Sequence, residues 1–202
     1  MTLPPGPQIR GFLPDHEGKH LHQLANGVAH LGPMLEIGSY CGRSTIWLGH
    51  AARLQGSIVF ALDHHRGSEE HQPGEFFHDE ALADVSGGID TLREFRHNIA
   101  NAQLEDHVIA LVGASAVVGK QLSQSDFSLV FIDGGHSLEA ALVDWRVFGT
   151  RVCRGGLLVI HDVFDNPAQG GQAPYTIWQM AVASGLFEEH SRCDSLRALR
   201  RL

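Results

Sequence analysis

Residues 35–45 constrain the fold of this chain more than any other segment. An apolar run is followed there by Gly38 and Gly42, a pattern typical of a buried strand that turns into the start of a helix. A second apolar run, at residues 58–62, ends in an acid, Asp63. In a doubly wound sheet, such a glycine turn lets a nucleoside approach the backbone, and the acid accepts hydrogen bonds from the ribose hydroxyls. The sequence therefore favours a protein that binds a nucleoside-bearing cofactor.

The composition limits the class of protein. The 202 residues fit one domain, which we expect to span residues 1–202 with an extended arm at 1–14. The net charge of −8 argues against a broad nucleic-acid surface. No apolar run approaches the roughly 20 residues of a membrane span. With only three cysteines and no secretion pattern, the chain is expected to be cytoplasmic.

Apolar runs and helical periodicities alternate along the chain. The pattern predicts strands at about 34–38, 57–62, 107–112, 127–132 and 156–161. It predicts helices at about 15–31, 43–54, 90–102, 115–122, 138–149 and 174–184. Two final runs, at 186–192 and 196–200, read as a hairpin. The expected fold class is α/β: a doubly wound, mostly parallel seven-stranded sheet with an antiparallel C-terminal hairpin.

Residues 64–89 interrupt this alternation. They contain four histidines, several acids, Pro73 and four glycines. A long segment of this kind inside a compact domain is often a lid or a binding loop. We expect a lid that has little core to bury, and a solvated surface insertion is the alternative.

Polar or glycine residues follow all five parallel strands. Ligands in such a sheet sit beyond the carboxyl ends of the strands, so these residues are the candidates for a site. Any one of them could serve a turn, because Asp and Gly favour turns in any protein. The candidates are Gly38 and Ser39, then Asp63 and His64, then Ala114 and Ser115, then Asp133 and His136, and finally His161 and Asp162.

These motifs resemble those of class I S-adenosylmethionine-dependent methyltransferases, over roughly residues 30–200. The resemblance rests on Glu36-x-Gly38-x-x-x-Gly42, Asp63, Gly113-Ala114-Ser115, Phe131-Ile132-Asp133-Gly134-Gly135-His136 and the run from Gly155 to Asp162. Within that class the pattern is similar to small metal-dependent O-methyltransferases of the catechol, macrocin and cephalosporin types, which include actinobacterial sugar O-methyltransferases. The resemblance implies a Rossmann-like fold and leaves a homodimer open.

The resemblance also implies which residues hold the cofactor. Glu36, Gly38 and Ser39 would line the methionine and ribose side of S-adenosylmethionine. Asp63 would bind the ribose hydroxyls, His64 would flank the adenosine, and Asp133 would complete the cofactor site. Ala114 and Ser115 would approach the adenine. The alternatives are a strand-end turn acid for Asp63 and a helix N-cap for Ser115.

A divalent metal is implied at Asp133 and Asp162, with His161 as a third candidate ligand. Oxygen ligands suit Mg²⁺, whereas a histidine suits Mn²⁺, iron or zinc better. The sequence departs here from the catechol-type pattern, which has Asp-Asn where this chain has His161-Asp162. A metal-free alternative stays open, in which Asp162 orients the acceptor or His136.

His136 is the candidate catalytic base. It lies three residues after Asp133, and Ser137 is expected to cap the helix that follows. The matching position in catechol-type enzymes holds the general base, and neutral imidazole can accept a proton near pH 7. The alternative is a solvated histidine in the first turn of a helix.

The expected function is methyl transfer to a hydroxyl of a sugar or another small polar acceptor, including an oligosaccharide. The 64–89 segment has only Phe76 and Phe77 as aromatics, which argues against a flat apolar phenol. Two alternatives from other classes remain. A nicotinamide-dependent oxidoreductase would need a Gly-x-Gly-x-x-Gly turn, which the spacing of Gly38 and Gly42 lacks. A non-catalytic nucleoside-binding module would leave His136, Asp133 and Asp162 without a shared site.

Overall fold

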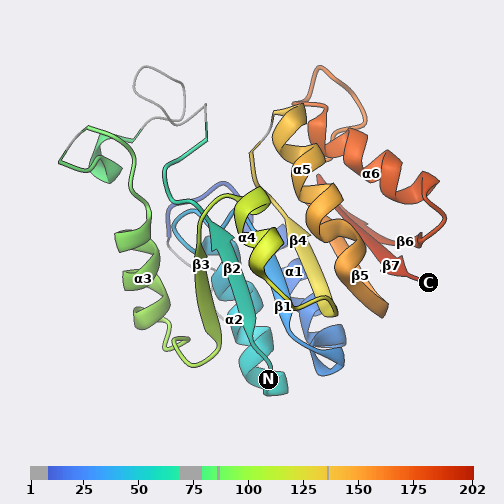
Figure 1. Cartoon of the computed structure of the whole chain (residues 1–202), viewed down its shortest axis with the longest axis horizontal. Helices are drawn as coiled ribbons and strands as arrows, with labels where there is room; N and C mark the ends of the chain where they lie inside the picture. Colours follow the sequence, from blue (N-terminus) through green and yellow to red (C-terminus); the bar gives the residue numbers. More distant parts are fainter. Residues whose placement is uncertain (1–8, 69–78, 86, 136) are drawn as a thin grey trace.

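The computed structural model describes residues 9–68, 79–85, 87–135 and 137–202. A seven-stranded sheet with the order β3-β2-β1-β4-β5-β7-β6 runs through the molecule (Figure 1). Strands β1 to β5 are parallel, and β7 runs antiparallel to both β5 and β6. The strands are β1 (Met34–Ile37), β2 (Val59–Asp63), β3 (Val108–Val112), β4 (Phe127–Ile132), β5 (Val152–Ile160), β6 (Phe187–Cys193) and β7 (Leu196–Arg201).

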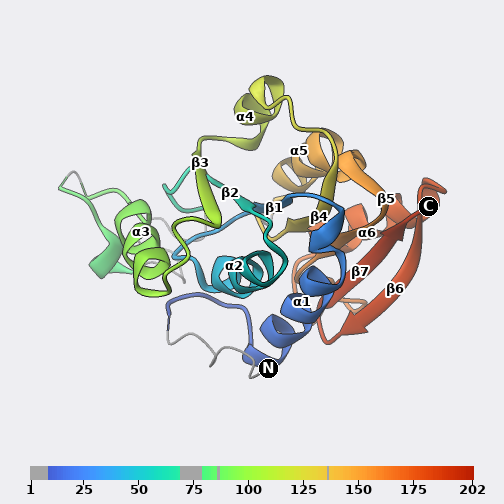
Figure 2. The same cartoon turned by 90° about the horizontal axis from the view of Figure 1, so that it is seen from below.

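Helices cover both faces of this sheet. Figure 2 shows α1 and α2 on one side of the strands and α4 and α5 on the other. The α-helices are α1 (Asp15–Val28), α2 (Arg43–Gln55), α3 (Leu92–Asn101), α4 (Ser115–Gln121), α5 (Leu138–Phe148) and α6 (Ala173–Ala183). Among the described residues, none of the helices has both the length and the apolar character that crossing a membrane requires.

The central strands are buried because helices pack on both of their faces. Every residue of β1 and β4 is buried. Buried parallel strands read as continuous apolar runs, and this is why the sequence pattern located them. Glu36 in β1 and Ser128 in β4 are the polar exceptions, and both are fully buried.

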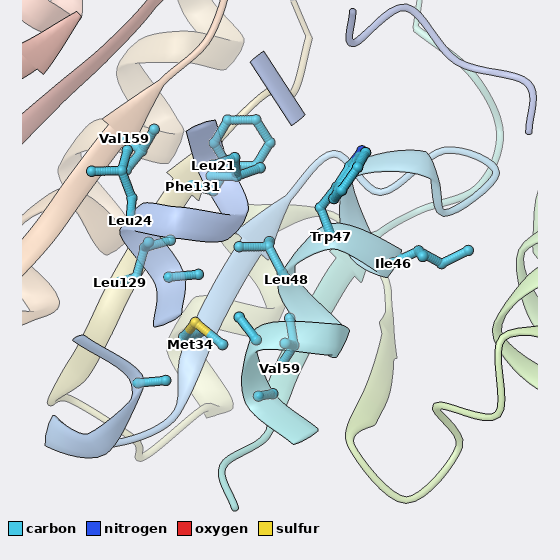
Figure 3. Packing of buried hydrophobic residues seen from close by; sticks show 14 of the residues in the cluster. Leu21, Leu24, Met34, Ile46, Trp47, Leu48, Val59, Leu129, Phe131 and Val159 are labelled. Atoms are coloured by element: carbon cyan, nitrogen blue, oxygen red, sulfur yellow. The ribbon is translucent and has the colours of Figure 1, made fainter. Parts of the chain in front are cut away.

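Two apolar clusters anchor the helices to the sheet. On one face, Leu21 and Leu24 of α1 and Trp47 and Leu48 of α2 pack over the strands (Figure 3). On the opposite face, α5 and α6 pack against β4 and β5. Burying each large apolar side chain contributes about 1.5–3 kcal/mol, so these two layers fix where the strand ends lie.

The observed elements agree with the sequence-based expectation for fold class, order and hairpin. The largest boundary difference lies in β5, which begins at Val152, four residues earlier than expected. The glycine pair at Gly155 and Gly156 hid this extension. Val152 pairs with Phe127 across a register shift in β4, and Gly155 takes a φ of +79° within the strand.

The described part of the 64–89 segment has more structure than the sequence indicated. It contains a short 3₁₀ helix, η3 (Glu80–Leu82), and a bridge that pairs Ala83 with Ile89. Leu82 and Ile89 are buried and pack with Cys41. Residues 79–85 and 87–89 therefore bury more apolar surface than expected, at Leu82 and Ile89, while residues 69–78 and 86 lie outside the described ones.

The order in which successive parallel strands are added to the sheet reverses at β1. From β1 the chain winds outward through β2 and β3, and it then returns to place β4 on the other side of β1. Such a switch point opens a crevice at the carboxyl ends of the two strands, where ligands bind in this class of sheet. Gly38 follows β1 at this point, and Asp133 follows β4.

Gly38 is required by close packing as well as by conformation. Its φ is +89°, which L side chains rarely adopt. A Cβ atom built on Gly38 would lie 2.0 Å from the backbone oxygen of Asp133. The backbone that approaches the glycine turn so closely is therefore the end of β4.

Replacing Gly38 with Ala should destabilise the protein by at least about 1–3 kcal/mol, the cost of a strained backbone conformation. The clash with the Asp133 carbonyl adds to this cost. Gly27→Ala is the matched control, because Gly27 is exposed in α1 and a Cβ there meets nothing within 4 Å. That control should gain about 0.5–1 kcal/mol. Urea unfolding measures both changes, and equal effects of the two substitutions would contradict this role of Gly38.

Candidate active site

The predicted site residues that the structure describes gather where the parallel strands end. Three non-glycine residues with positive φ lie at these ends: Tyr40 (+44°), His65 (+58°) and Asp162 (+55°). A non-glycine residue in this region costs free energy and persists only where the surrounding structure holds it. Backbone strain of this kind concentrates at functional sites, so it supports a site at this edge of the sheet.

Asp63 connects the ends of β1 and β2. One carboxylate oxygen, Oδ2, accepts a hydrogen bond of 2.8 Å from the backbone N–H of Tyr40. The other, Oδ1, accepts one of 2.7 Å from the N–H of His65. Each oxygen keeps a second lone pair, so the carboxylate can shape the turn and still accept a ligand hydroxyl. The turn acid and the ribose-binding acid of the sequence analysis are therefore compatible roles.

Glu36 lies beneath the glycine turn with none of its surface exposed. The hydroxyl of Thr45 in α2 donates to its Oε2. Burial raises the pKa of Glu36 to about 8, although the nearby hydroxyls of Ser44 and Thr45 lower it. Glu36 therefore carries a proton at neutral pH.

Two buried polar atoms at the turn have no hydrogen-bond partner among the described residues: Oε1 of Glu36 and Oγ of Ser39. Buried polar groups are nearly always paired, so each such exception needs an explanation. S-adenosylmethionine carries amino, carboxylate and hydroxyl groups that could pair with them. The two orphan atoms fit the positions that the sequence assigned to the cofactor.

The residues assigned to the adenine lie at the ends of β2 and β3. His64 is exposed, and its Nδ1 accepts a hydrogen bond of 3.0 Å from the N–H of Arg66. Ala114 is the N-cap residue of α4, so the N-cap role considered for Ser115 falls one residue earlier. The Ser115 hydroxyl lies instead near Asp144, a buried acid of α5, and lowers the pKa of its carboxyl. Burial raises the pKa of Asp144 to about 6.

Asp133, His161 and Asp162 form the one group of candidate metal ligands found among the described residues, with one ligand atom from each lying within 4.8 Å of the others. Nδ1 of His161 is 3.0 Å from Oδ1 of Asp133 and 3.4 Å from Oδ2 of Asp162. His161 is 4% exposed, whereas both aspartates are partly exposed. The structure thus brings together the three residues that the sequence proposed as metal ligands.

Glu17 of α1 completes this group, and the sequence analysis did not identify it. Its Oε2 is 2.8 Å from Nε2 of His161, and the carboxylate is 1% exposed. Burial alone would lower the pKa of His161, but the charge of Asp133 and the hydrogen bonds to Asp133, Asp162 and Glu17 raise it well above its usual range. The imidazole is therefore charged, and both of its nitrogens donate to carboxylates.

The charge on the imidazole of His161 limits which atoms of this group could bind a metal. A histidine binds a metal through a nitrogen lone pair, which neither nitrogen of a doubly protonated imidazole offers. The oxygens of Asp133 and Asp162 remain as donors, and partly exposed carboxylates with water in the other positions suit Mg²⁺. The three carboxylates around one imidazolium leave two negative charges in excess, which favours a divalent cation.

His136, the candidate base, lies outside the described residues. Its neighbours are described and agree with the sequence analysis. The side chain of Ser137 accepts a hydrogen bond from Ala140 N and caps α5, as expected.

A small cavity of about 10 Å³, the size of one water molecule, adjoins Asp133 and His161 between α5 and α6.

The N-terminal arm lies against the glycine turn. Arg43, the first residue of α2, donates to the carbonyls of Leu13 (2.7 Å) and Ile9 (2.8 Å). The ring of Phe12 lies 6.0 Å from the ring of Tyr40, and Phe12 is 58% exposed. The arm therefore forms part of the surface beside the turn.

The comparisons with known proteins agree with this geometry. A protein-family model described as a methyltransferase domain matches residues 35–163, which span β1 to the end of β5. The chain therefore belongs to this methyltransferase family. The matched range contains every predicted site residue, but it contains neither Glu17 nor the C-terminal hairpin.

The chain is also similar to individual proteins. It is 30% identical over 186 residues to a catechol O-methyltransferase of Mycobacterium tuberculosis; the match covers 92% of this chain and 64% of that protein. Solved structures share the fold. The O-methyltransferase NovP gives a TM-score of 0.69 at 17% identity, and the match covers 91% of this chain and 78% of that one. Cofactor-bound Rv0187 from MTB gives a TM-score of 0.69 at 21% identity, and the match covers 95% of this chain and 82% of that one. TomG from Streptomyces achromogenes, solved with SAM, gives a TM-score of 0.61 at 18% identity, and the match covers 95% of this chain and 82% of that one. The sheet is thus the Rossmann-like sheet of class I methyltransferases.

Glu36→Gln tests the buried, protonated state of Glu36. A glutamate in the unfolded chain titrates near pH 4.3, roughly, whereas the folded-state pKa is about 8. Between these values the folded state holds a proton that the unfolded state has lost, so the stability of the wild type falls as the pH rises. Glutamine does not titrate. Thermal unfolding from about pH 5 to about pH 8 should therefore show the variant gaining stability relative to the wild type. A difference that stays constant with pH would show that Glu36 is ionised.

Proposed function

We propose that this protein is an S-adenosylmethionine-dependent O-methyltransferase. The observation that carries the proposal is the convergence of the glycine turn, Asp63 and the group around Asp133 at one edge of the sheet. Membership in the methyltransferase family supports it, as does the similarity to a protein named catechol O-methyltransferase. Because the chain spans 64% of the length of that relative, the activity stands as a proposal.

In this proposal the strand-end residues divide the work. S-adenosylmethionine supplies an electrophilic methyl group on a positively charged sulfur. Asp63 binds the ribose hydroxyls, and Glu36 and Ser39 face the methionine part with their unpaired oxygens. His136 takes the proton of the acceptor hydroxyl, which contributes about 10²–10⁴-fold to the rate. Alignment of the acceptor with the methyl group contributes much of the remainder.

We further propose that a divalent metal assists, held by Asp133 and Asp162. A bound Mg²⁺ supplies a Lewis acid that lowers the pKa of an acceptor hydroxyl. His161 would remain beside the two aspartates as a hydrogen-bond donor, because ligation would require it to give up Glu17 or Asp133. With oxygen donors only, Mg²⁺ or Mn²⁺ fits better than zinc.

For the acceptor we propose a hydroxyl of a sugar or of another small polar molecule. The polar 64–89 segment that extends from the cofactor strand end supports this choice. The name of the Mycobacterium tuberculosis relative points to catechol as the second candidate. The exposed ring of Phe12 beside Tyr40 favours keeping that candidate in the test, because aromatic rings stack on both phenols and sugars.

The proposal is tested by an acceptor screen. Purified protein is incubated with S-adenosylmethionine and a panel of sugars, polyols and catechol, and a mass gain of one methyl group is sought by mass spectrometry. Calorimetry with S-adenosylhomocysteine and with a dinucleotide is run in parallel. Binding of the dinucleotide alone would favour an oxidoreductase, and binding without turnover on any acceptor would favour a non-catalytic module.

Asp63→Asn should weaken the binding of S-adenosylhomocysteine by about 1–3 kcal/mol, the scale of hydrogen bonds to a charged group. Asparagine keeps the size of the side chain and removes its charge. Asp126→Asn is the control, because Asp126 is exposed and directly precedes β4, so it lies at the amino ends of the parallel strands, opposite the candidate site. Unchanged calorimetric affinity in a folded Asp63→Asn variant would refute the assignment.

Chelation should abolish turnover, and Mg²⁺ or Mn²⁺ should restore it. Asp162→Asn should raise the metal concentration that is needed and lower the rate by about 10–100-fold, on the scale known for changes around metal ligands. Asparagine tolerates the left-handed backbone conformation of Asp162, so the change removes charge without refolding the turn. Full activity of the chelated wild type would eliminate the metal and leave proton transfer to the protein.

A further inference from the structure

Glu17 is a buried carboxylate that reaches the candidate site from outside the matched methyltransferase domain. It lies in the first turn of α1, and 1% of it is exposed. The family match begins at residue 35, so α1 is not part of it. A buried charge is costly unless it is fully paired, and the carboxylate of Glu17 accepts four hydrogen bonds.

The two oxygens of Glu17 have different partners. Oε1 accepts hydrogen bonds from Ser195 N (2.8 Å), Ser195 Oγ (2.9 Å) and Leu196 N (3.1 Å). These donors belong to the turn between β6 and β7 and the start of β7. Oε2 accepts from Nε2 of His161 at 2.8 Å. One oxygen therefore fastens α1 to the C-terminal hairpin, and the other contacts the site.

The contact continues through the imidazole to the two aspartates. The opposite ring nitrogen of His161 lies 3.0 Å from Asp133 and 3.4 Å from Asp162. Because the imidazole ring is planar and rigid, fixing Nε2 also fixes the direction in which Nδ1 points. We propose that Glu17 is a positioning residue that acts through His161 to hold the carboxylates of Asp133 and Asp162 in place. The inference rests on the proposed function, since it assigns those aspartates to the metal and acceptor site.

A purely structural role does not account for this arrangement. Replacing a buried ion pair with apolar side chains of similar volume is often neutral or stabilising, so fastening α1 to the sheet needs no charge at this position. Directional hydrogen bonds add what apolar packing lacks, a defined orientation for the groups beyond the imidazole. Groups around metal ligands that orient them in this way typically account for about 10–100-fold in metal affinity or activity.

Glu17→Gln and Ser195→Ala form a matched pair of variants. The three donors around Oε1 require an acceptor, so the Gln carbonyl takes that position and its NH₂ group faces His161. The first variant thus removes the acceptor for Nε2 and keeps the shape of the side chain. Ser195→Ala removes one donor from the other oxygen and leaves the contact with His161 intact.

Three assays are run on both variants and the wild type. They are calorimetry for the affinity for S-adenosylhomocysteine, electron paramagnetic resonance for the affinity for Mn²⁺, and steady-state kinetics for kcat and KM with catechol or the best acceptor of the screen. Glu17→Gln should leave the S-adenosylhomocysteine affinity unchanged and lower Mn²⁺ affinity and kcat by about 10–100-fold. Ser195→Ala should stay close to the wild type in all three. In a His161→Gln background, Glu17→Gln should lower kcat no further, because its effect passes through His161.

The outcomes separate the two proposals. A wild type that neither binds S-adenosylhomocysteine nor transfers a methyl group would refute the proposed function itself. An active wild type with equal kcat for Glu17→Gln and Ser195→Ala would refute the positioning role and leave the function standing. If Glu17→Gln does not fold, the double variant Glu17→Met/His161→Leu replaces the buried pair with apolar groups. It should bind S-adenosylhomocysteine with low kcat, and wild-type kcat in it would overturn the inference.

Discussion

The close approach of the turn after β1 to the backbone after β4 is the constraint on which the candidate site depends. It occurs at the switch point of the sheet, where the chain has wound outward on one side of β1 and returned on the other. Only a glycine fits at position 38, because the carbonyl of Asp133 occupies the space of a side chain. The same contact brings Asp133 next to the turn and its buried acid, Glu36. The packing of backbone on backbone thus sets the distance between the residues that follow β1 and those that follow β4.

The acidic groups on the two sides of the contact between Gly38 and Asp133 differ in their charge. Beneath the turn, burial keeps Glu36 protonated, so the structure avoids an unpaired buried anion there. Beyond β4 and β5, the ionised Asp133 and Glu17 flank one imidazolium. A divalent cation would neutralise the excess negative charge of the second group, whereas the protonated Glu36 adds no charge beneath the turn. The electrostatics therefore match the metal that we propose.

Sequence reasoning recovered the fold because the signals for it are local. The strands are buried on both faces and read as continuous apolar runs, and each strand end carries its polar residue directly behind the run. The start of β5 was missed because Gly155 and Gly156 resemble a turn although they lie within the strand. Leu82 and Ile89 were missed because two apolar residues in a polar segment have no period, and only the contact with Cys41 shows their burial.

Only the part of the site that lies directly after the parallel strands could be predicted from the sequence. Glu17 carries no such signal, because an acid in the first turn of a helix is favoured by the helix dipole in any protein. Its partner lies 144 residues away, a separation that no local pattern spans. The contribution of α1 and the hairpin to the site is therefore a property of the folded chain alone. The matched domain supplies the strand ends, while the flanking segments supply Glu17 and its anchor at Ser195. Movement of α1 would thus reach Asp133 and Asp162 through one imidazole, without any change in the sheet.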